Sequence, residues 1–120
     1  MNEIALLHTE KQAEAAMAAS SRAPVFIFKH STHCGVSTRA IHQFRSFAEE
    51  EAPGLGYYQV DVIESRAASD DLELMTLVRH ASPQVLLIWN EECVWHASHG
   101  EIQAAALHAQ AEKIRDRLRK

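Results

Sequence analysis

Short apolar runs alternate along this chain with segments whose apolar residues recur every three to four positions. The runs predict strands, and the recurring positions predict amphipathic helices. Thr9 and Gln12 have the spacing of a capping box, so we expect a first helix to begin there. It is expected to end before Pro24, because proline disfavours helical geometry in the residue that precedes it. The buried face of this helix is expected at Ala13, Ala16, Met17 and Ser20.

The middle of the chain contains two strands, each followed by a helix. A strand at 25–29 precedes a helix that runs to about Glu51, and the segment 53–56, rich in proline and glycine, then breaks the chain. A strand at 57–62 and a short helix at 65–77 follow. The apolar positions of the first helix are Ala40, Ile41, Phe44, Phe47 and Ala48, and those of the second are Leu72, Met75 and Val78.

The last third of the chain is typical of a hairpin followed by a helix. Strands at 85–89 and 93–96 are joined through Asn90-Glu91, which is a weaker hairpin signal than Asn-Gly. Ser98 and Glu101 have capping-box spacing, so the closing helix is expected to begin there. Its buried stripe is expected at Leu107, Ala111, Ile114 and Leu118.

This order of elements indicates one α/β domain that covers residues 1–120. Strands separated by helices pair in parallel, whereas the two strands of the hairpin pair antiparallel. We therefore expect a four-stranded mixed sheet with helices on both faces. A chain of this length is large enough to bury a hydrophobic core without disulfide bonds.

The composition of the chain limits the cellular compartment and the class of binding partner that we expect for it. The formal net charge of −4 argues against a nucleic-acid partner, which normally requires a basic face. The basic residues among the last ten complement the negative end of a helix dipole. No signal-peptide pattern opens the chain, no apolar run approaches the ~20 residues that span a bilayer, and two cysteines are too few for a secreted disulfide scaffold. We expect a soluble, cytoplasmic protein with no membrane partner.

Cys34 is the strongest candidate for chemistry, because it stands between the strand at 25–29 and the helix that follows. A thiol at a helix N-terminus meets unsatisfied N–H groups and the positive end of the helix dipole, which favour the nucleophilic thiolate. Ser37 occupies the position where dithiol oxidoreductases have a second cysteine. Any exchange chemistry therefore runs on one sulfur, with Cys34 as the catalytic nucleophile.

Two roles are open for each polar neighbour of Cys34. Ser37 either donates a hydrogen bond to the thiolate, which lowers the pKa of the thiol, or satisfies backbone groups in the first helical turn. Lys29, His30 and His33 are basic groups that could stabilise the thiolate, and the alternative for Lys29 is a solvated side chain at the end of a strand. A zinc site built from the histidines with Cys34 or Cys93 has no Cys-x-x-Cys or paired-ligand framework, so no metal site is expected.

Cys93 lies in the strand at 93–96. Free cysteine is among the most buried residue types, so Cys93 is expected to be a small core residue. It would resolve an adduct on Cys34 only if the two Cα atoms came within about 7 Å, which a strand distant from the active-site loop does not favour.

The order of elements, the reactive cysteine at a helix start and the later Ser82-Pro83 are similar to the thioredoxin-like arrangement. This resemblance implies that the proline is cis and that Ser82 and Pro83 border the site. It also implies that the backbone of the residue before the proline pairs with a bound partner. Outside this fold a trans proline would be expected, since only about 5–6% of such bonds in folded proteins are cis.

Three stretches of the chain resemble a narrower family, the monothiol bacilliredoxins of the bacillithiol system. They are Phe28 to Cys34 with Ser37, Val78 to Gln84, and Val94 to His99. The resemblance implies that Thr32 and Gly35 line the site with the residues named above. It implies bacillithiol as a co-substrate with no tightly bound cofactor, and S-thiolated proteins and a low-molecular-weight thiol as partners.

The residue after Cys34 departs from the family pattern. The family usually has proline there, whereas Gly35 makes Cys-Gly-Val-Ser closer to the Cys-Gly-x-Ser of monothiol glutaredoxins. The favoured hypothesis is a monothiol thiol-disulfide oxidoreductase that removes bacillithiol, or a similar small thiol, from protein mixed disulfides. One alternative is an iron–sulfur cluster carrier of the monothiol glutaredoxin kind, although the Gly-Gly-x-Asp stretch is missing after Pro83. The other is a thioredoxin-like adaptor without turnover.

Overall fold

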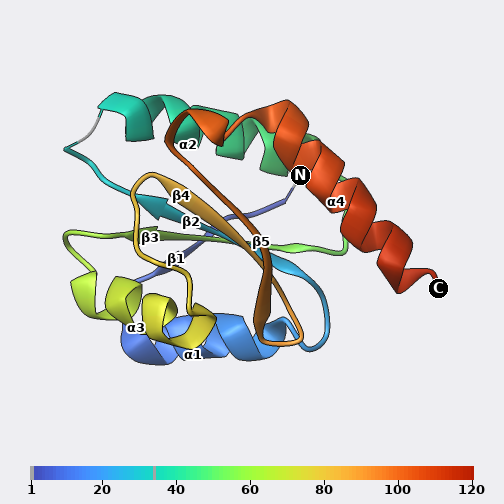
Figure 1. Ribbon diagram of the computed structural model, residues 1–120, viewed down its shortest axis with the longest axis horizontal. Coiled ribbons are helices and arrows are strands. Elements are labelled where there is room, and N and C mark those ends of the chain that lie inside the picture. Colours follow the sequence, from blue (N-terminus) through green and yellow to red (C-terminus); the bar gives the residue numbers. More distant parts are fainter. Residues whose placement is uncertain (1, 34) are drawn as a thin grey trace.

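The central sheet of the computed structural model has five strands within residues 2–33 and 35–120, which are the residues that the structure describes. Across the sheet they lie in the order β1 (Ala5–Leu7), β3 (Gly56–Asp61), β2 (Val25–His30), β4 (Gln84–Trp89) and β5 (Glu92–Ser98). β1, β3 and β2 are parallel, and β4 and β5 are each antiparallel to the preceding strand. Figure 1 shows this mixed sheet between two layers of helices.

The expected four-stranded sheet is wrong by one strand, because the sequence pattern did not predict β1. This strand has three residues, of which only Leu7 is buried, and it pairs with β3 at the edge of the sheet. A strand so short and so exposed produces neither an apolar run nor a clear alternation in the sequence. The other four strands lie within two residues of their predicted bounds.

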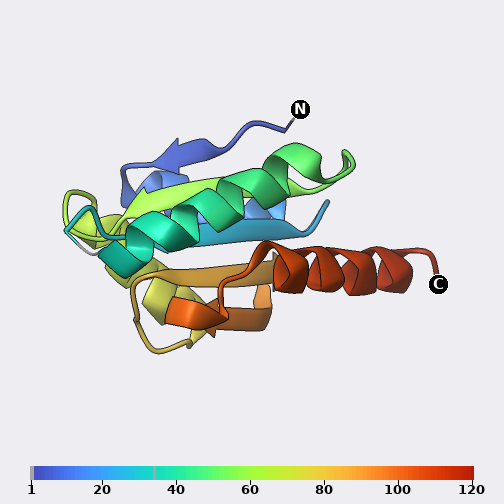
Figure 2. The same ribbon diagram turned by 90° about the horizontal axis from the view of Figure 1, so that it is seen from above.

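Of the described helices, two cover each face of the sheet. α1 (Glu10–Ala19) and α3 (Arg66–Thr76) pack on one face, and α2 (Gly35–Glu50) and α4 (Ala104–Leu118) pack on the other. A short 3₁₀ helix, η1 (His99–Glu101), precedes α4. Seen from above, α2 lies along the sheet and α4 extends away from it toward the C-terminus (Figure 2). No helix in the described part of the chain combines the length and the apolar composition needed to cross a membrane.

α1 begins at the predicted capping box. Oγ1 of Thr9 accepts the backbone N–H of Gln12 at 3.1 Å, and Oε1 of Gln12 accepts the backbone N–H of Thr9 at 3.2 Å. All four residues expected on the buried face of α1 are buried. The local sequence pattern is therefore sufficient to predict this helix.

β2 lies in the middle of the sheet and is buried on both faces. Phe26 and Phe28 pack in the core formed with α2 and α4, whereas Val25 and Ile27 pack in the core formed with α1 and α3. Lys29, which follows Phe28 in the strand, also has no exposed surface. Because side chains alternate along a strand, one segment of the chain connects the two cores.

The hairpin between β4 and β5 turns at Asn90 and Glu91, whose φ angles are 52° and 63°. Two positive φ angles are typical of the type I′ turn of two-residue hairpins. The turn is attached to the end of α1, because the N–H of Glu91 donates to Oγ of Ser20 at 2.8 Å and the N–H of Asn90 donates to the Ser20 carbonyl at 3.0 Å.

The closing helix begins later than its predicted start. The capping box of Ser98 and Glu101 does form, but it opens η1. α4 begins at Ala104, whose N–H donates to Oε1 of Gln43 in α2 at 2.9 Å. A side chain from a distant helix therefore satisfies this helix end, which no local pattern can show. Leu118 is 44% exposed, so the buried stripe is shorter than expected.

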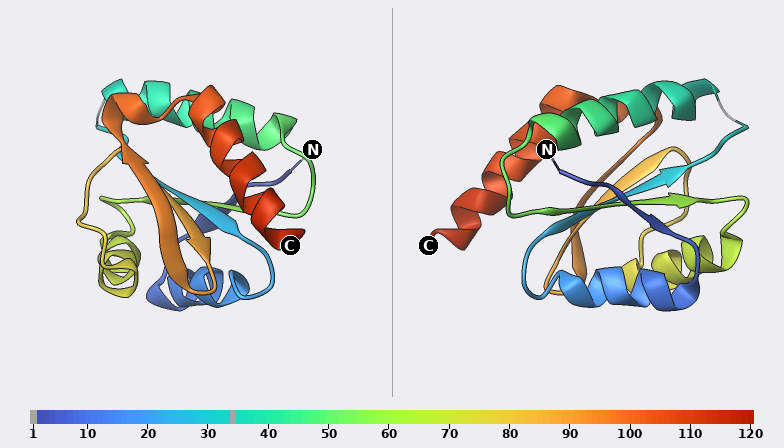
Figure 3. Two further views of the ribbon diagram at one scale, coloured as in Figure 1. Left: turned by 45° about the vertical axis from the view of Figure 1, so that its right-hand side comes forward. Right: turned by 180° about the vertical axis from the view of Figure 1, so that it is seen from behind.

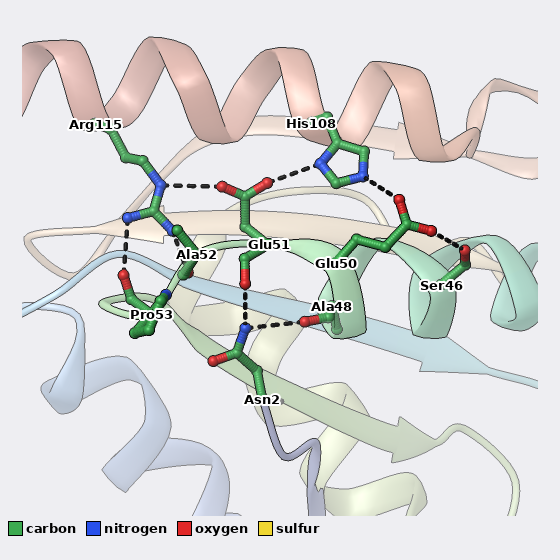
Figure 4. A network of polar contacts seen from close by, with 9 residues as sticks. All are labelled: Asn2, Ser46, Ala48, Glu50, Glu51, Ala52, Pro53, His108 and Arg115. Atoms are coloured by element: carbon green, nitrogen blue, oxygen red, sulfur yellow. Dashed lines mark hydrogen bonds and ion pairs between the residues drawn. The ribbon is translucent and has the colours of Figure 1, made fainter.

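Glu51 joins the end of α2 to α4 (Figure 4). Its carboxylate accepts a hydrogen bond from Nε of Arg115 at 3.1 Å and lies 2.7 Å from Nδ1 of His108. Arg115 also donates to the carbonyl oxygens of Pro53 and Ala52, at 3.0 and 2.5 Å. The Glu51 side chain is 13% exposed and that of Arg115 is 19% exposed, so this pair is held in a largely desolvated position.

We expect Glu51→Gln to lower the free energy of unfolding by about 1–3 kcal/mol, because Arg115 would lose its charged partner at a mostly buried site. Glu50→Gln is the matched control. Its side chain is 66% exposed and lies 3.7 Å from His108, so its loss should cost no more than about 0.5 kcal/mol. Urea unfolding followed by circular dichroism measures both variants, and equal losses would contradict the expectation.

Candidate functional site

The end of β2 leads through a short loop into α2. β2 ends at His30, and α2 begins at Gly35, the residue after Cys34 in the chain. Cys34 itself lies outside the described residues, so the structure shows the site through its neighbours. A Cβ placed on Gly35 would meet no atom within 4 Å, which means that packing does not require glycine at this position.

Ser37 lies in the first turn of α2 and is completely buried. Its Oγ accepts the backbone N–H of Ser31 at 3.0 Å and lies 2.8 Å from Nδ1 of His30. The hydroxyl therefore satisfies a backbone group, as serines at helix ends often do. These contacts attach the first turn of α2 to the end of β2 and to the loop that follows it.

The tautomer of His30 determines what the Ser37 hydroxyl can donate. Burial lowers the pKa of His30, and the nearby Asp61 carboxylate opposes that shift, so the neutral ring is favoured. If Nδ1 carries the proton, it donates to Oγ of Ser37 and leaves the hydroxyl proton free for another acceptor. If Nε2 carries the proton, the hydroxyl donates to Nδ1 instead.

Lys29 lies on the opposite side of the sheet from His30, because adjacent strand residues point to opposite faces. Its Nζ lies 3.3 Å from Nδ1 of His80. Burial lowers the pKa of the Lys29 ammonium, and the carboxylates of Glu73 and Asp70 oppose that shift. Burial also lowers the pKa of His80, and the charge of Lys29 acts in the same direction. Lys29 is therefore a buried group with a specific partner rather than a solvated side chain.

The peptide bond between Ser82 and Pro83 is cis, as the thioredoxin-like resemblance implies. Directly after it, Gln84 opens β4 and pairs with Lys29 of β2. The carbonyl oxygen of Pro83 accepts the N–H of His99 at 3.0 Å. The cis-proline segment is thus fixed against the end of β2 on one side and against η1 on the other.

The predicted site residues divide into a buried group and an exposed group. The buried ones are Lys29, Ser37 and Pro83, the exposed ones are Thr32, His33 and Gly35, and Ser82 is half-buried. Sequence reasoning gave no role to His80, the partner of Lys29. A lysine that ends an apolar strand does signal a buried polar contact, but it does not indicate which distant residue provides it.

Cys93 is half-buried and packs against the core formed with α1 and α3, so it is less enclosed than expected. Its Sγ donates a hydrogen bond to the carbonyl oxygen of Trp95 at 3.3 Å. Burial raises the pKa of the Cys93 thiol, and hydrogen bonds with the backbone of Trp95 and Leu87 oppose that shift. The raised pKa disfavours the thiolate, which is the reactive form.

Within residues 2–33 and 35–120, no three His, Cys, Asp or Glu side chains are grouped so as to hold a metal ion. His96 and His99, which share the spacing of His30 and His33, are both exposed. The described part of the chain therefore contains no ready-made zinc centre.

Similarity to known proteins extends over most of the chain. Residues 5–107 match the sequence model of a family described as monothiol bacilliredoxin BrxC. A solved protein with a thioredoxin fold and a proposed oxidoreductase activity is 34% identical to this chain. The match has a TM-score of 0.78 and covers 91% of this chain and 93% of that one.

Thioredoxins from two flatworms are also similar in structure. The thioredoxin of Fasciola hepatica is 16% identical with a TM-score of 0.74, over 92% of this chain and 98% of its own. The thioredoxin of Schistosoma mansoni is 18% identical with a TM-score of 0.73, over 93% of this chain and 98% of its own. At such identity these matches establish the thioredoxin-like fold, which confirms the predicted fold class.

We expect Ser37→Ala to lower the free energy of unfolding by about 1–3 kcal/mol, because the backbone N–H of the buried Ser31 would lose its acceptor. Ser46→Ala removes a hydroxyl from the exposed face of the same helix and should change stability by no more than about 0.5 kcal/mol. Urea unfolding of both variants measures the difference. A similar small effect in both would mean that the Ser37 contacts contribute little.

We expect Lys29→Met to be at least as stable as the wild type at pH 7, because methionine fills a similar volume without a buried charge. Between the lowered folded-state pKa and 10.5, the unfolded chain binds a proton that the folded chain does not. Wild-type stability therefore rises with pH across this window, and the advantage of Lys29→Met shrinks. Thermal unfolding from pH 7 to 10.5 tests this, with the exposed Lys113→Met as the control. A constant difference over that range would contradict the expectation.

Proposed function

The chain belongs to the monothiol bacilliredoxin family, and we propose that it removes bacillithiol, or a similar low-molecular-weight thiol, from mixed disulfides on proteins. Cys34 is the nucleophile in this proposal. Family membership and the related thioredoxin-fold protein support a thioredoxin-like oxidoreductase. The particular thiol, the protein substrates and the direction of exchange belong to the proposal.

The proposed step is a thiol-disulfide exchange on one sulfur. The Cys34 thiolate attacks the sulfur of the small thiol in the protein mixed disulfide. A disulfide forms between Cys34 and the small thiol, the original disulfide breaks, and the protein cysteine leaves as a thiolate. The protein cysteine is reduced as Cys34 is oxidised to the same level, so no external electron acceptor is needed. A second thiol, from a small molecule or a partner protein, then releases the small thiol from Cys34.

The observation that carries this proposal is the position of Ser37 and the hydrogen bonds of its side chain. This residue stands where a dithiol enzyme has its resolving cysteine, and its buried hydroxyl is engaged by His30 and by the backbone of Ser31. An oxygen cannot release the adduct by disulfide formation. The cycle therefore depends on a second thiol from outside the chain, and we place such a thiol supply in the cytoplasm.

The start of α2 supports a thiolate at Cys34. The helix begins at the residue that follows Cys34 in the chain, and the unsatisfied N–H groups and positive dipole end of a helix N-terminus favour a thiolate there. In the tautomer with the ring proton on Nδ1 of His30, the Ser37 hydroxyl has a proton to donate to that thiolate. The role of Ser37 in lowering the pKa of the thiol thus depends on His30.

The remaining site residues divide between partner binding and positioning. Ser82 and Pro83 border the bound protein, whose backbone pairs with Ser82 in this proposal. The exposed Thr32 and His33 contact the incoming mixed disulfide. Lys29 acts as a positioning residue through His80, two residues before Ser82. No tightly bound cofactor takes part, and bacillithiol acts as a co-substrate.

We expect the pure protein to gain the mass of one bacillithiol when it is incubated with oxidised bacillithiol, and less or none with oxidised glutathione. The adduct should disappear in Cys34→Ser and persist in Cys93→Ser, which is the matched control. Intact mass spectrometry measures both, and a bacillithiolated model protein tests release. An adduct that follows Cys93 would overturn the assignment of the nucleophile.

The same preparation distinguishes the alternatives. Absence of an adduct from either reagent, with a Cys34 pKa near that of free cysteine, would favour an adaptor without turnover. A coloured dimer that forms on reconstitution with iron, sulfide and glutathione would favour a cluster carrier.

A further inference from the structure

A pocket lies between α2 and η1, beside the segment that carries the proposed nucleophile. We call it the α2–η1 pocket; its walls include Val36, Arg39, His42, Gln43, His99 and Ile102. Its volume of about 690 Å³ is within the range of small-molecule sites. Figure 3 shows η1 lying beside the first half of α2, and the hydrogen bond from Ala104 to Gln43 fixes the start of α4 against the same helix.

The distance from this pocket to the reacting sulfur is limited by the covalent chain. Val36 lines the pocket and follows Cys34 by two residues. Two residues of extended chain span at most about 7 Å between Cα atoms. The covalent chain therefore keeps the backbone of Cys34 close to one residue of the pocket wall.

The pocket walls combine apolar and basic side chains. Val36, Ala40 and Ile102 supply apolar surface, whereas Arg39 and His42 stand one helical turn apart on the exposed side of α2. His99 reaches the pocket from η1. None of the described residues that line it is acidic. In a chain with a formal net charge of −4, this is a local concentration of basic groups.

The backbone of His99 is in the left-handed region. Its φ is 53°, a conformation that is uncommon for residues other than glycine, although Asn, Asp and His adopt it more often than the rest. The conformation is maintained by the hydrogen bond from the His99 N–H to the Pro83 carbonyl and by that from the Ile102 N–H to the His99 carbonyl. With this backbone, His99 brings an imidazole to the pocket from η1.

We propose that the α2–η1 pocket binds the carboxylate-bearing end of the low-molecular-weight thiol while its sulfur is exchanged at Cys34. This inference rests on the proposed function and adds the site that selects the small thiol. Arg39 is the main selectivity residue, because its planar guanidinium pairs with a carboxylate through two parallel hydrogen bonds. His42 and His99 contact the same anionic group from either side, and Gln43 and Ile102 close the pocket behind it.

The test compares small disulfides that differ in charge, on a Cys93→Ser background in which Cys34 is the one remaining cysteine. The reagents are dithiodipropionate, which is anionic, bis(2-hydroxyethyl) disulfide, which is neutral, and cystamine, which is cationic. The rate of adduct formation is followed by intact mass. The ratio of the anionic to the neutral rate within one variant cancels most of the effect of the Cys34 pKa, because both reactions use the same thiolate.

We expect this ratio to exceed that of an uncharged cysteine model compound by about threefold to tenfold, and to fall with added salt. Arg39→Gln should lower the ratio by about threefold or more. Arg22→Gln, at an exposed arginine after α1 that lies outside the pocket, should leave it unchanged. A ratio equal to that of the model compound, or equal effects of both substitutions, would overturn the proposal.

A second variant guards against indirect effects on the fold. His99→Asn removes the imidazole but keeps a residue that tolerates a positive φ, so the backbone of η1 should be preserved. It should lower the ratio of the anionic to the neutral rate, as Arg39→Gln does. An unchanged preference in both Arg39→Gln and His99→Asn would overturn the assignment of the pocket.

The outcomes separate this inference from the function on which it rests. Failure of every disulfide to modify Cys34 would overturn the exchange function and the pocket assignment with it. Modification by all three reagents without charge preference would overturn the pocket assignment alone. A preference seen only with an acidic cysteine peptide, presented as its mixed disulfide with 2-mercaptoethanol, would assign the basic pocket to the protein substrate and also overturn the proposal.

Discussion

The structure depends on the burial of one strand, β2, between two layers of helices. Its apolar side chains supply both cores, so Lys29 at its end is buried with them and His30 is half-buried. A buried polar group is costly unless it is hydrogen-bonded. Lys29 forms a hydrogen bond with His80 on one face of the sheet, and His30 forms one with Ser37 on the other. The need to satisfy two adjacent polar residues therefore attaches the cis-proline segment and the first turn of α2 to the same strand end.

This arrangement makes the proposed active site a product of packing on both faces of the sheet. The layer of α1 and α3 controls the environment of Lys29, and the layer of α2 and α4 controls that of His30. η1 completes the site because the backbone of His99 bonds to Pro83. A substitution in either core can thus alter the site without touching a residue that meets substrate.

Much of the fold was predictable from local sequence patterns. The features that were not predicted depend on contacts between distant parts of the chain. The capping box at Thr9, four of the five strands and the fold class follow from periodicity, turn residues and element order. The cis bond at Pro83 was predictable only from the resemblance. β1 escaped prediction because it takes its stability from pairing with β3 rather than from its own apolar content. The start of α4 and the partner of Lys29 depend on Gln43 and His80, which contact them from distant parts of the chain.

Gly35 has a consequence for how such a site can change over time. Open space surrounds the position where its Cβ would lie, and its place at the start of α2 suits proline as well as glycine. Packing therefore does not oppose either residue next to the nucleophile. Selection on the rate and the partner of exchange can act at this position almost independently of selection on stability, so related chains can diverge in reactivity there while the surrounding fold stays the same.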